Sequence, residues 1–102
     1  MFVRKLYRLF KNRPEIFRLD KLPKIKNKAG NIVQLYGECL LDGTEIAIDY
    51  RHDLLSTLLH EALHYFHPEC TEREVLSEEK WLVNNLSSKQ IKNILKRFAE
   101  II

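Results

Sequence analysis

Apolar residues recur along the chain with two periods, which divide it into helical and extended segments. Near the N-terminus they recur every three or four positions until Pro14, and this spacing predicts an amphipathic helix over residues 2–12, within an N-terminal unit of residues 1–14. Residues 15–50 carry the pattern of short strands. The last stripe predicts an amphipathic helix over residues 88–102, with apolar positions at Ile91, Ile94, Leu95, Phe98 and Ile101.

The extended part of the chain predicts a small three-stranded sheet. Its first strand is irregular, over residues 16–26, because Pro23 interrupts it. A second strand is predicted over residues 32–41, and Asp42-Gly43 predicts a tight hairpin turn because both residues tolerate positive φ. The return strand covers residues 44–50, with Ile46 and Ile48 on one face and Glu45, Ala47 and Asp49 on the other.

Two more helical patterns lie between the sheet and the last helix. Asp53 stands at the N-cap of a leucine-rich helix over residues 53–67, which ends there because Pro68 cannot continue it. Thr71, followed three residues later by a glutamate, is a capping-box pattern that opens a helix over residues 71–84. The sequence therefore predicts one α+β domain over residues 1–102, with the sheet packed on these two helices.

Composition argues against a membrane-spanning, secreted or disulfide-rich protein. Hydrophobic residues make up 45% of the chain and charged residues 30%, and no apolar run approaches the roughly 20 residues that span a bilayer. Charges interrupt the apolar positions at the N-terminus, which argues against a secretory signal, and two cysteines do not make a disulfide framework. We therefore expect a cytoplasmic protein with no transmembrane segment.

The stretch HEALH, residues 60–64, carries the candidate chemistry. Positions i and i+4 of a helix share a face, so His60 and His64 can direct two imidazoles at one ion, at the roughly 2 Å that zinc requires. Glu61 is then placed to take a proton from a zinc-bound water, which makes it the candidate catalytic base. The pattern predicts one Zn²⁺ per chain; the alternative is a partly buried helix with two surface histidines.

Catalytic zinc usually takes a third protein ligand, and Glu74 is predicted for this position. A short turn after Pro68 brings the first turn of the next helix back beside His64. Glu78, one turn further, is expected to accept a hydrogen bond from a ligand histidine, although such glutamates also simply favour a helix N-terminus. Three alternatives remain open for the third ligand: His67, Cys70 and Glu78.

These residues resemble the gluzincin metallopeptidases, and more narrowly the minigluzincins, which are catalytic domains of about this length. The resemblance covers the small sheet, the HEALH helix and the stretch EVLSE at residues 74–78, where a ligand glutamate is followed four positions later by an acidic residue. It implies hydrolysis of peptide bonds in a peptide or protein substrate, with Glu61 as general base. It also implies substrate docking as an extra strand on a sheet edge, here around residues 44–50.

The chain departs from the gluzincin pattern because neither histidine nor tyrosine follows Glu74 to stabilise the oxyanion. Tyr65 is expected to point away from the zinc. The C-terminal helix is expected either to complete the core or to cover the cleft, as in a latent zymogen or across a homodimer. Upstream candidates for the oxyanion role are Tyr36, Tyr50 and His52.

A binding module is the competing class of function. The N-terminal helix interleaves basic residues with Tyr7 and Phe10, a pattern that also occurs where helices contact nucleic acid or an anionic membrane. Its apolar positions are better explained as core contacts, so the sequence alone gives no clear indication of nucleic acid. A third alternative is a zinc-stabilised interaction domain in which Glu61 is dispensable. The basic residues of the N-terminal helical pattern, on which the binding-module alternative depends, are Arg4, Lys5, Arg8, Lys11 and Arg13.

Overall fold

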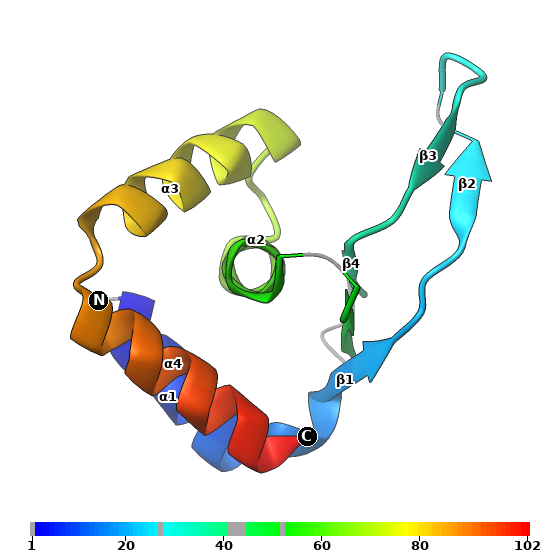
Figure 1. The fold of residues 1–102 in the computed structure, drawn as a ribbon. Coiled ribbons are helices and arrows are strands. Elements are labelled where there is room, and N and C mark those ends of the chain that lie inside the picture. Colours follow the sequence, from blue (N-terminus) through cyan, green and yellow to red (C-terminus); the bar gives the residue numbers. More distant parts are fainter. Residues whose placement is uncertain (1, 27, 41–44, 52) are drawn as a thin grey trace.

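The structure is a computed structural model that describes residues 2–26, 28–40, 45–51 and 53–102. Within these residues it confirms the α+β class, with a three-stranded sheet, a separate two-stranded sheet and four α-helices (Figure 1). The helices are α1 (Phe2–Asn12), α2 (Leu54–Phe66), α3 (Glu72–Asn85) and α4 (Ser88–Ile101), with a 3₁₀ turn at Pro14–Ile16. The strands are β1 (Phe17–Asp20), β2 (Lys24–Lys26), β3 (Ile32–Gln34), β4 (Gly37–Cys39) and β5 (Ile46–Asp49).

Side-chain caps begin three of the helices. The Asp53 carboxylate accepts a hydrogen bond from the Ser56 backbone N–H at 3.1 Å and opens α2. Thr71 and Glu74 form the predicted capping box at the start of α3, and Ser87 and Gln90 form another at the start of α4. The helix boundaries therefore follow local signals that the sequence carries.

The strands differ from the prediction in how they pair. The two long strands expected over residues 16–26 and 32–41 each divide in two. Their outer halves, β2 and β3, form an antiparallel ribbon that projects from the body, whereas β1 and β4 flank β5 (Figure 1). The predicted turn at Asp42-Gly43 lies outside the described residues.

Strand β5 is central, so the prediction that residues 44–50 form a sheet edge is wrong. It pairs in parallel with β1 and antiparallel with β4, which leaves β4 as an outer strand beside α2. The predicted alternation along β5 is also not observed as burial, because all four of its residues, Asp49 included, are buried. Both faces of this strand are covered.

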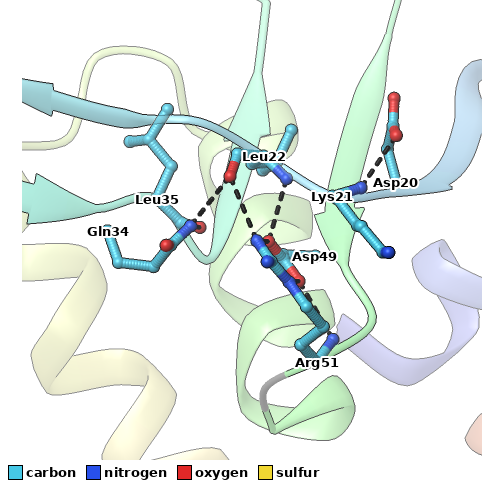
Figure 2. Close-up of polar contacts among 7 residues, drawn as sticks. All are labelled: Asp20, Lys21, Leu22, Gln34, Leu35, Asp49 and Arg51. Atoms are coloured by element: carbon cyan, nitrogen blue, oxygen red, sulfur yellow. Dashed lines mark hydrogen bonds and ion pairs between the residues drawn. The ribbon is translucent and has the colours of Figure 1, made fainter.

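A polar network around Asp49 explains the division of the strands (Figure 2). The buried Asp49 carboxylate accepts hydrogen bonds from the Leu22 backbone N–H at 2.9 Å and from the Arg51 guanidinium at 2.6 Å. The Leu22 carbonyl in turn accepts from Arg51 and from the Gln34 side-chain amide, which also reaches the Leu35 carbonyl. These bonds tie the β1–β2 connection to the β3–β4 connection, at the point where both chains leave the main sheet.

Helix α4 completes the hydrophobic core. Phe98 packs near Phe10 of α1 and Phe17 of β1, with ring centroids 6.1 and 5.8 Å apart, and Ile94 is fully buried. Burial of a side chain of this size contributes roughly 1.5–3 kcal/mol. Helices α1 and α4 lie side by side on one side of α2, while α3 and β4 flank α2 on its other sides (Figure 1).

Candidate metal centre

Helix α2 directs its two histidines to one point. The Nε2 atoms of His60 and His64 are 3.2 Å apart, and their rings meet at an interplanar angle of 72°. Two nitrogen ligands of a tetrahedral zinc ion, each at about 2.05 Å, are separated by about 3.3 Å. The opposite face of the same helix is buried in the core through Leu58, Leu59, Ala62 and Leu63. The spacing of the histidines is therefore already that of a zinc site.

Glu72, at the start of α3, supplies the carboxylate beside the histidine pair. Its two oxygens lie 2.6 Å from His60 Nε2 and 2.8 Å from His64 Nε2, and one ligand atom from each of the three residues lies within 4.8 Å of the others. The oxygen ligand of a tetrahedral zinc needs about half an ångström more separation from the nitrogens. The Glu72 side chain can withdraw because it is 62% exposed. Two imidazoles and one carboxylate match the ligand set of a catalytic zinc site.

Glu79 fixes the tautomer of His60. Its Oε1 lies 2.8 Å from His60 Nδ1, and an ionised carboxylate only accepts hydrogen bonds, so Nδ1 carries the proton. The lone pair of His60 Nε2 then faces the Glu72 carboxylate and His64 Nε2. Lone pairs that converge in this way repel one another unless a cation, either a proton or a metal ion, lies among them.

Glu61 is buried against strand β4. Its side chain is enclosed so closely that a Cβ atom added to Gly37 would lie 2.8 Å from both Glu61 Cγ and Glu61 Oε2. Burial raises the pKa of the Glu61 carboxyl to about 7; His60 opposes this shift, and nearby carboxylates, first Glu72, add to it. A carboxyl with a pKa near 7 can exchange a proton at neutral pH.

Two cavities meet at His60 and Glu61. One, of about 390 Å³, extends past His64 to Cys39, Leu40 and Pro68. The other, of about 580 Å³, extends between Tyr36 on the strand side and Leu76 on α3. Gly37 and Glu72 line both, so the candidate metal site and the Glu61 carboxylate lie at the centre of one elongated cleft.

The structure does not place Glu74 beside the histidines, so this part of the ligand prediction is wrong. Glu74 Oε1 accepts a hydrogen bond from the Thr71 backbone N–H at 2.9 Å, which lowers the pKa of Glu74 and directs its carboxylate at the N-cap. Glu74 and Glu78 line a different cavity of about 430 Å³, bordered by α1. The expected partner of a ligand histidine is correspondingly Glu79 and not Glu78.

The alternative ligands His67 and Cys70 also lie in that other cavity. His67 is the C-cap of α2, and its Nδ1 lies 3.5 Å from Glu69. Burial, followed by the charge of Glu74, raises the pKa of the Cys70 thiol, so the thiolate that zinc prefers is disfavoured. His52, a candidate for the oxyanion role, lies outside the described residues.

Tyrosines stand at both ends of the cleft. Tyr65, which was expected to point away from the zinc, is among the residues that line the cavity with His60, Glu61 and His64. Its hydroxyl accepts a hydrogen bond from Arg13 at 2.9 Å. Tyr36 lines the second cavity, whereas Tyr50 is 46% exposed after β5 and belongs to neither lining. Of the tyrosines considered for the oxyanion role, Tyr36 therefore lines the cleft, whereas the Tyr65 hydroxyl is engaged by Arg13, which belongs to neither lining.

Helix α4 contributes no residue to either cavity lining, so in the described structure it completes the core and leaves the cleft uncovered. None of the described helices is long and apolar enough to cross a bilayer. No protein family, curated protein or solved structure matches this chain.

Proposed function

We propose that the chain is a zinc-dependent peptidase in which His60, His64 and Glu72 hold the metal. The observation that carries the proposal is the convergence of these three side chains beside the buried Glu61 carboxylate in one cleft. Three protein ligands leave a fourth position for water or substrate, as in catalytic zinc sites. Bound zinc supplies a Lewis acid, which polarises the substrate carbonyl and lowers the pKa of water.

Glu61 performs the proton transfers. Its carboxylate takes a proton from the attacking water as the new C–O bond forms, and it delivers that proton to the leaving amine as the C–N bond breaks. Glu61 lines the same cavity as His60 and His64, which places its carboxylate beside the reacting groups. Glu79 holds the His60 ring with Nε2 turned toward the metal, through the hydrogen bond to Nδ1.

The substrate is an extended peptide that adds to strand β4. This strand pairs with β5 on one side, and Gly37 and Cys39 line the cleft. An extra strand on the other side of β4 would pass over Glu61 and the histidine pair, and its backbone would be held by hydrogen bonds without regard to sequence. This docking edge replaces the edge expected around residues 44–50.

A matched pair of variants tests the ligand set. Glu72→Gln and Glu74→Gln make the same chemical change two residues apart, and glutamine still closes a capping box at position 74. We expect about one zinc per chain by elemental mass spectrometry in the wild type and in Glu74→Gln, and loss of zinc in Glu72→Gln. Zinc retained in Glu72→Gln but lost in Glu74→Gln would contradict the assignment.

Catalysis is tested with Glu61→Gln on a casein substrate and a mixed peptide library. We expect the variant to bind zinc as the wild type does and to lose turnover. A wild type that binds zinc and cleaves nothing would leave the zinc-stabilised interaction domain as the better account. A wild type that takes up no zinc would show that a proton, and not a metal ion, lies among the three ligands.

A further inference from the structure

Positive charge is concentrated on two helices that contribute no residue to the metal cluster. Helices α1 and α4 hold eight of the seventeen Lys and Arg residues of the chain but one of its fourteen Asp and Glu residues, Glu100. All eight side chains are exposed. We call this set the basic face; its members are Arg4, Lys5, Arg8, Lys11, Lys89, Lys92, Lys96 and Arg97.

The two halves of the basic face lie on adjacent helices. In α1 the cations lie opposite the buried stripe of Val3, Leu6, Leu9 and Phe10, and in α4 the lysines lie opposite Ile94 and Phe98. The two helices lie side by side (Figure 1). Arg97 of α4 stacks over the Tyr7 ring of α1, 4.2 Å from its centroid, and so joins the two halves.

The basic face forms no ion pair with the carboxylates that the structure describes. Elsewhere Arg18 pairs with Asp20 and Glu45, and Arg51 pairs with the buried Asp49. Among the residues that the structure describes, no member of the basic face has a carboxylate oxygen within 4.0 Å. Eight uncompensated cations repel one another, and an external polyanion relieves this repulsion.

We propose that the basic face binds the phosphate backbone of duplex DNA. Within the described residues of α1 and α4 no large apolar side chain is exposed, and the exposed Ile102 follows the end of α4, so these two helices present no apolar side chain for insertion into a lipid bilayer. The Tyr7 ring is covered by Arg97, which removes the platform on which unpaired bases would stack. Only charge remains for recognition. Helix α4, at 14 residues, is about 21 Å long, and a duplex segment of that length carries roughly a dozen phosphates over its two strands.

The test is fluorescence anisotropy of a labelled 20-base-pair DNA duplex of mixed sequence between 50 and 200 mM salt. The first variant combines Arg8→Gln, Lys11→Gln, Lys92→Gln and Lys96→Gln. The matched control removes the same charge from the projecting ribbon and the connection that leads into it, with Lys21→Gln, Lys24→Gln, Lys26→Gln and Lys28→Gln. Circular dichroism verifies that both variants are folded.

We expect the basic-face variant to bind the duplex at least about tenfold more weakly than the wild type, with a salt slope reduced by roughly 0.9 for each lost phosphate contact. The ribbon variant is expected to bind within about threefold of the wild type. His64→Ala is expected to bind DNA as the wild type does, because the basic face is independent of the metal.

Three outcomes would overturn the proposal. The first is no binding of the wild type to the duplex at 50 mM salt. The second is an equal loss of DNA affinity in the basic-face variant and the control variant, which would show that binding depends on net charge alone. The third is tighter binding to vesicles containing 30% phosphatidylserine than to the duplex, which would show that the face is a membrane surface.

Discussion

Gly37→Ala is the substitution that best tests how the cleft is built, because Gly37 is the point where β4 touches α2. An added Cβ would lie 2.7 Å from Thr57 Cγ2 and 2.8 Å from both Glu61 Cγ and Glu61 Oε2. Carbon atoms in contact are normally 3.5–4.0 Å apart, so each of these neighbours must move by about 1 Å. Two of the three overlaps fall on the proposed general base.

Overpacking of this kind costs about 1–3 kcal/mol of unfolding free energy. The effect on catalysis is expected to be larger than the effect on stability, since a displacement of about 1 Å in a reacting group can cost roughly a hundredfold in rate. The proposed metal ligands are His60, His64 and Glu72, and no atom of theirs is among the three atoms nearest to the added Cβ. We therefore expect unchanged zinc content and a kcat lowered by about ten- to a hundredfold.

Gly30→Ala and Thr57→Ser separate the effect of lost stability from the effect of a displaced Glu61. Gly30 has φ +83° and open space around its Cβ position, so alanine there costs backbone strain of roughly 1 kcal/mol and leaves kcat unchanged. In the Gly37→Ala background, Thr57→Ser removes the Cγ2 overlap and is expected to restore part of the stability. It leaves the Glu61 overlaps, so it does not restore kcat.

The measurements are urea unfolding, zinc content and peptidase kinetics for the four proteins. A Gly37→Ala protein with wild-type kcat and lower stability would refute the reasoning, because it would show that Glu61 can move without consequence. Recovery of kcat with Thr57→Ser would refute it as well, by placing the damage at Thr57.

Three further predictions concern individual side chains. Asp49→Asn removes a carboxylate whose pKa is held well below its ordinary value of about 4 by hydrogen bonds from Arg51. The wild type should therefore exceed the variant in urea stability above about pH 4, and this difference should become smaller as the pH falls below about 4 toward the folded-state pKa. A difference as large at about pH 2 as at about pH 6 would count against it. Glu79→Gln should weaken zinc binding by roughly 10- to 100-fold in competition with a chelator, while wild-type affinity would show that the bond to His60 is immaterial. Cys70, tested in a Cys39→Ser background, should react with iodoacetamide at pH 7.5 more slowly than free cysteine, because burial raises the pKa of its thiol; a faster reaction would reopen the thiolate alternative.

Local signals in the sequence were sufficient to predict the helices and the histidine pair. Asp53 opens α2, and the i, i+4 spacing turns His60 and His64 to one side of it. These features depend on contacts within a few residues, so no knowledge of the tertiary structure was needed. The same reasoning predicted the burial of α4, because its apolar stripe at helical spacing is long enough to require a partner.

The sequence already contained a reason against Glu74 as the third ligand. A capping box commits its glutamate to the N-cap, so recognition of the Thr71–Glu74 box should have excluded Glu74 from the metal. Glu72 and Glu79 are seven residues apart and share the other face of α3. Which face turns toward α2 depends on the burial of Val75 and Leu82 in the core, and sequence spacing alone does not determine that.

The strand pairing depends on contacts that no local pattern reveals. Leu22 gives its backbone N–H to Asp49, 27 residues away, and this bond ends β1 and redirects the chain into the ribbon (Figure 2). The alternating pattern of residues 44–50 predicts that Asp49 is an outward-facing polar residue of an edge strand. Its burial requires the guanidinium of Arg51, whose position depends on the whole sheet.

The candidate metal site and the basic face lie on different pairs of helices. The proposed zinc ligands come from α2 and α3, which are joined by residues 67–71, so the candidate site is assembled within one helical hairpin. Helices α1 and α4 cover the core and contribute no zinc ligand, which leaves their outer surfaces free to carry charge. Because the two surfaces share no residue, substitutions in the basic face and in the metal centre should have additive effects on stability. Non-additivity between Lys92→Gln and Glu72→Gln would show that the two helical pairs are coupled through the core.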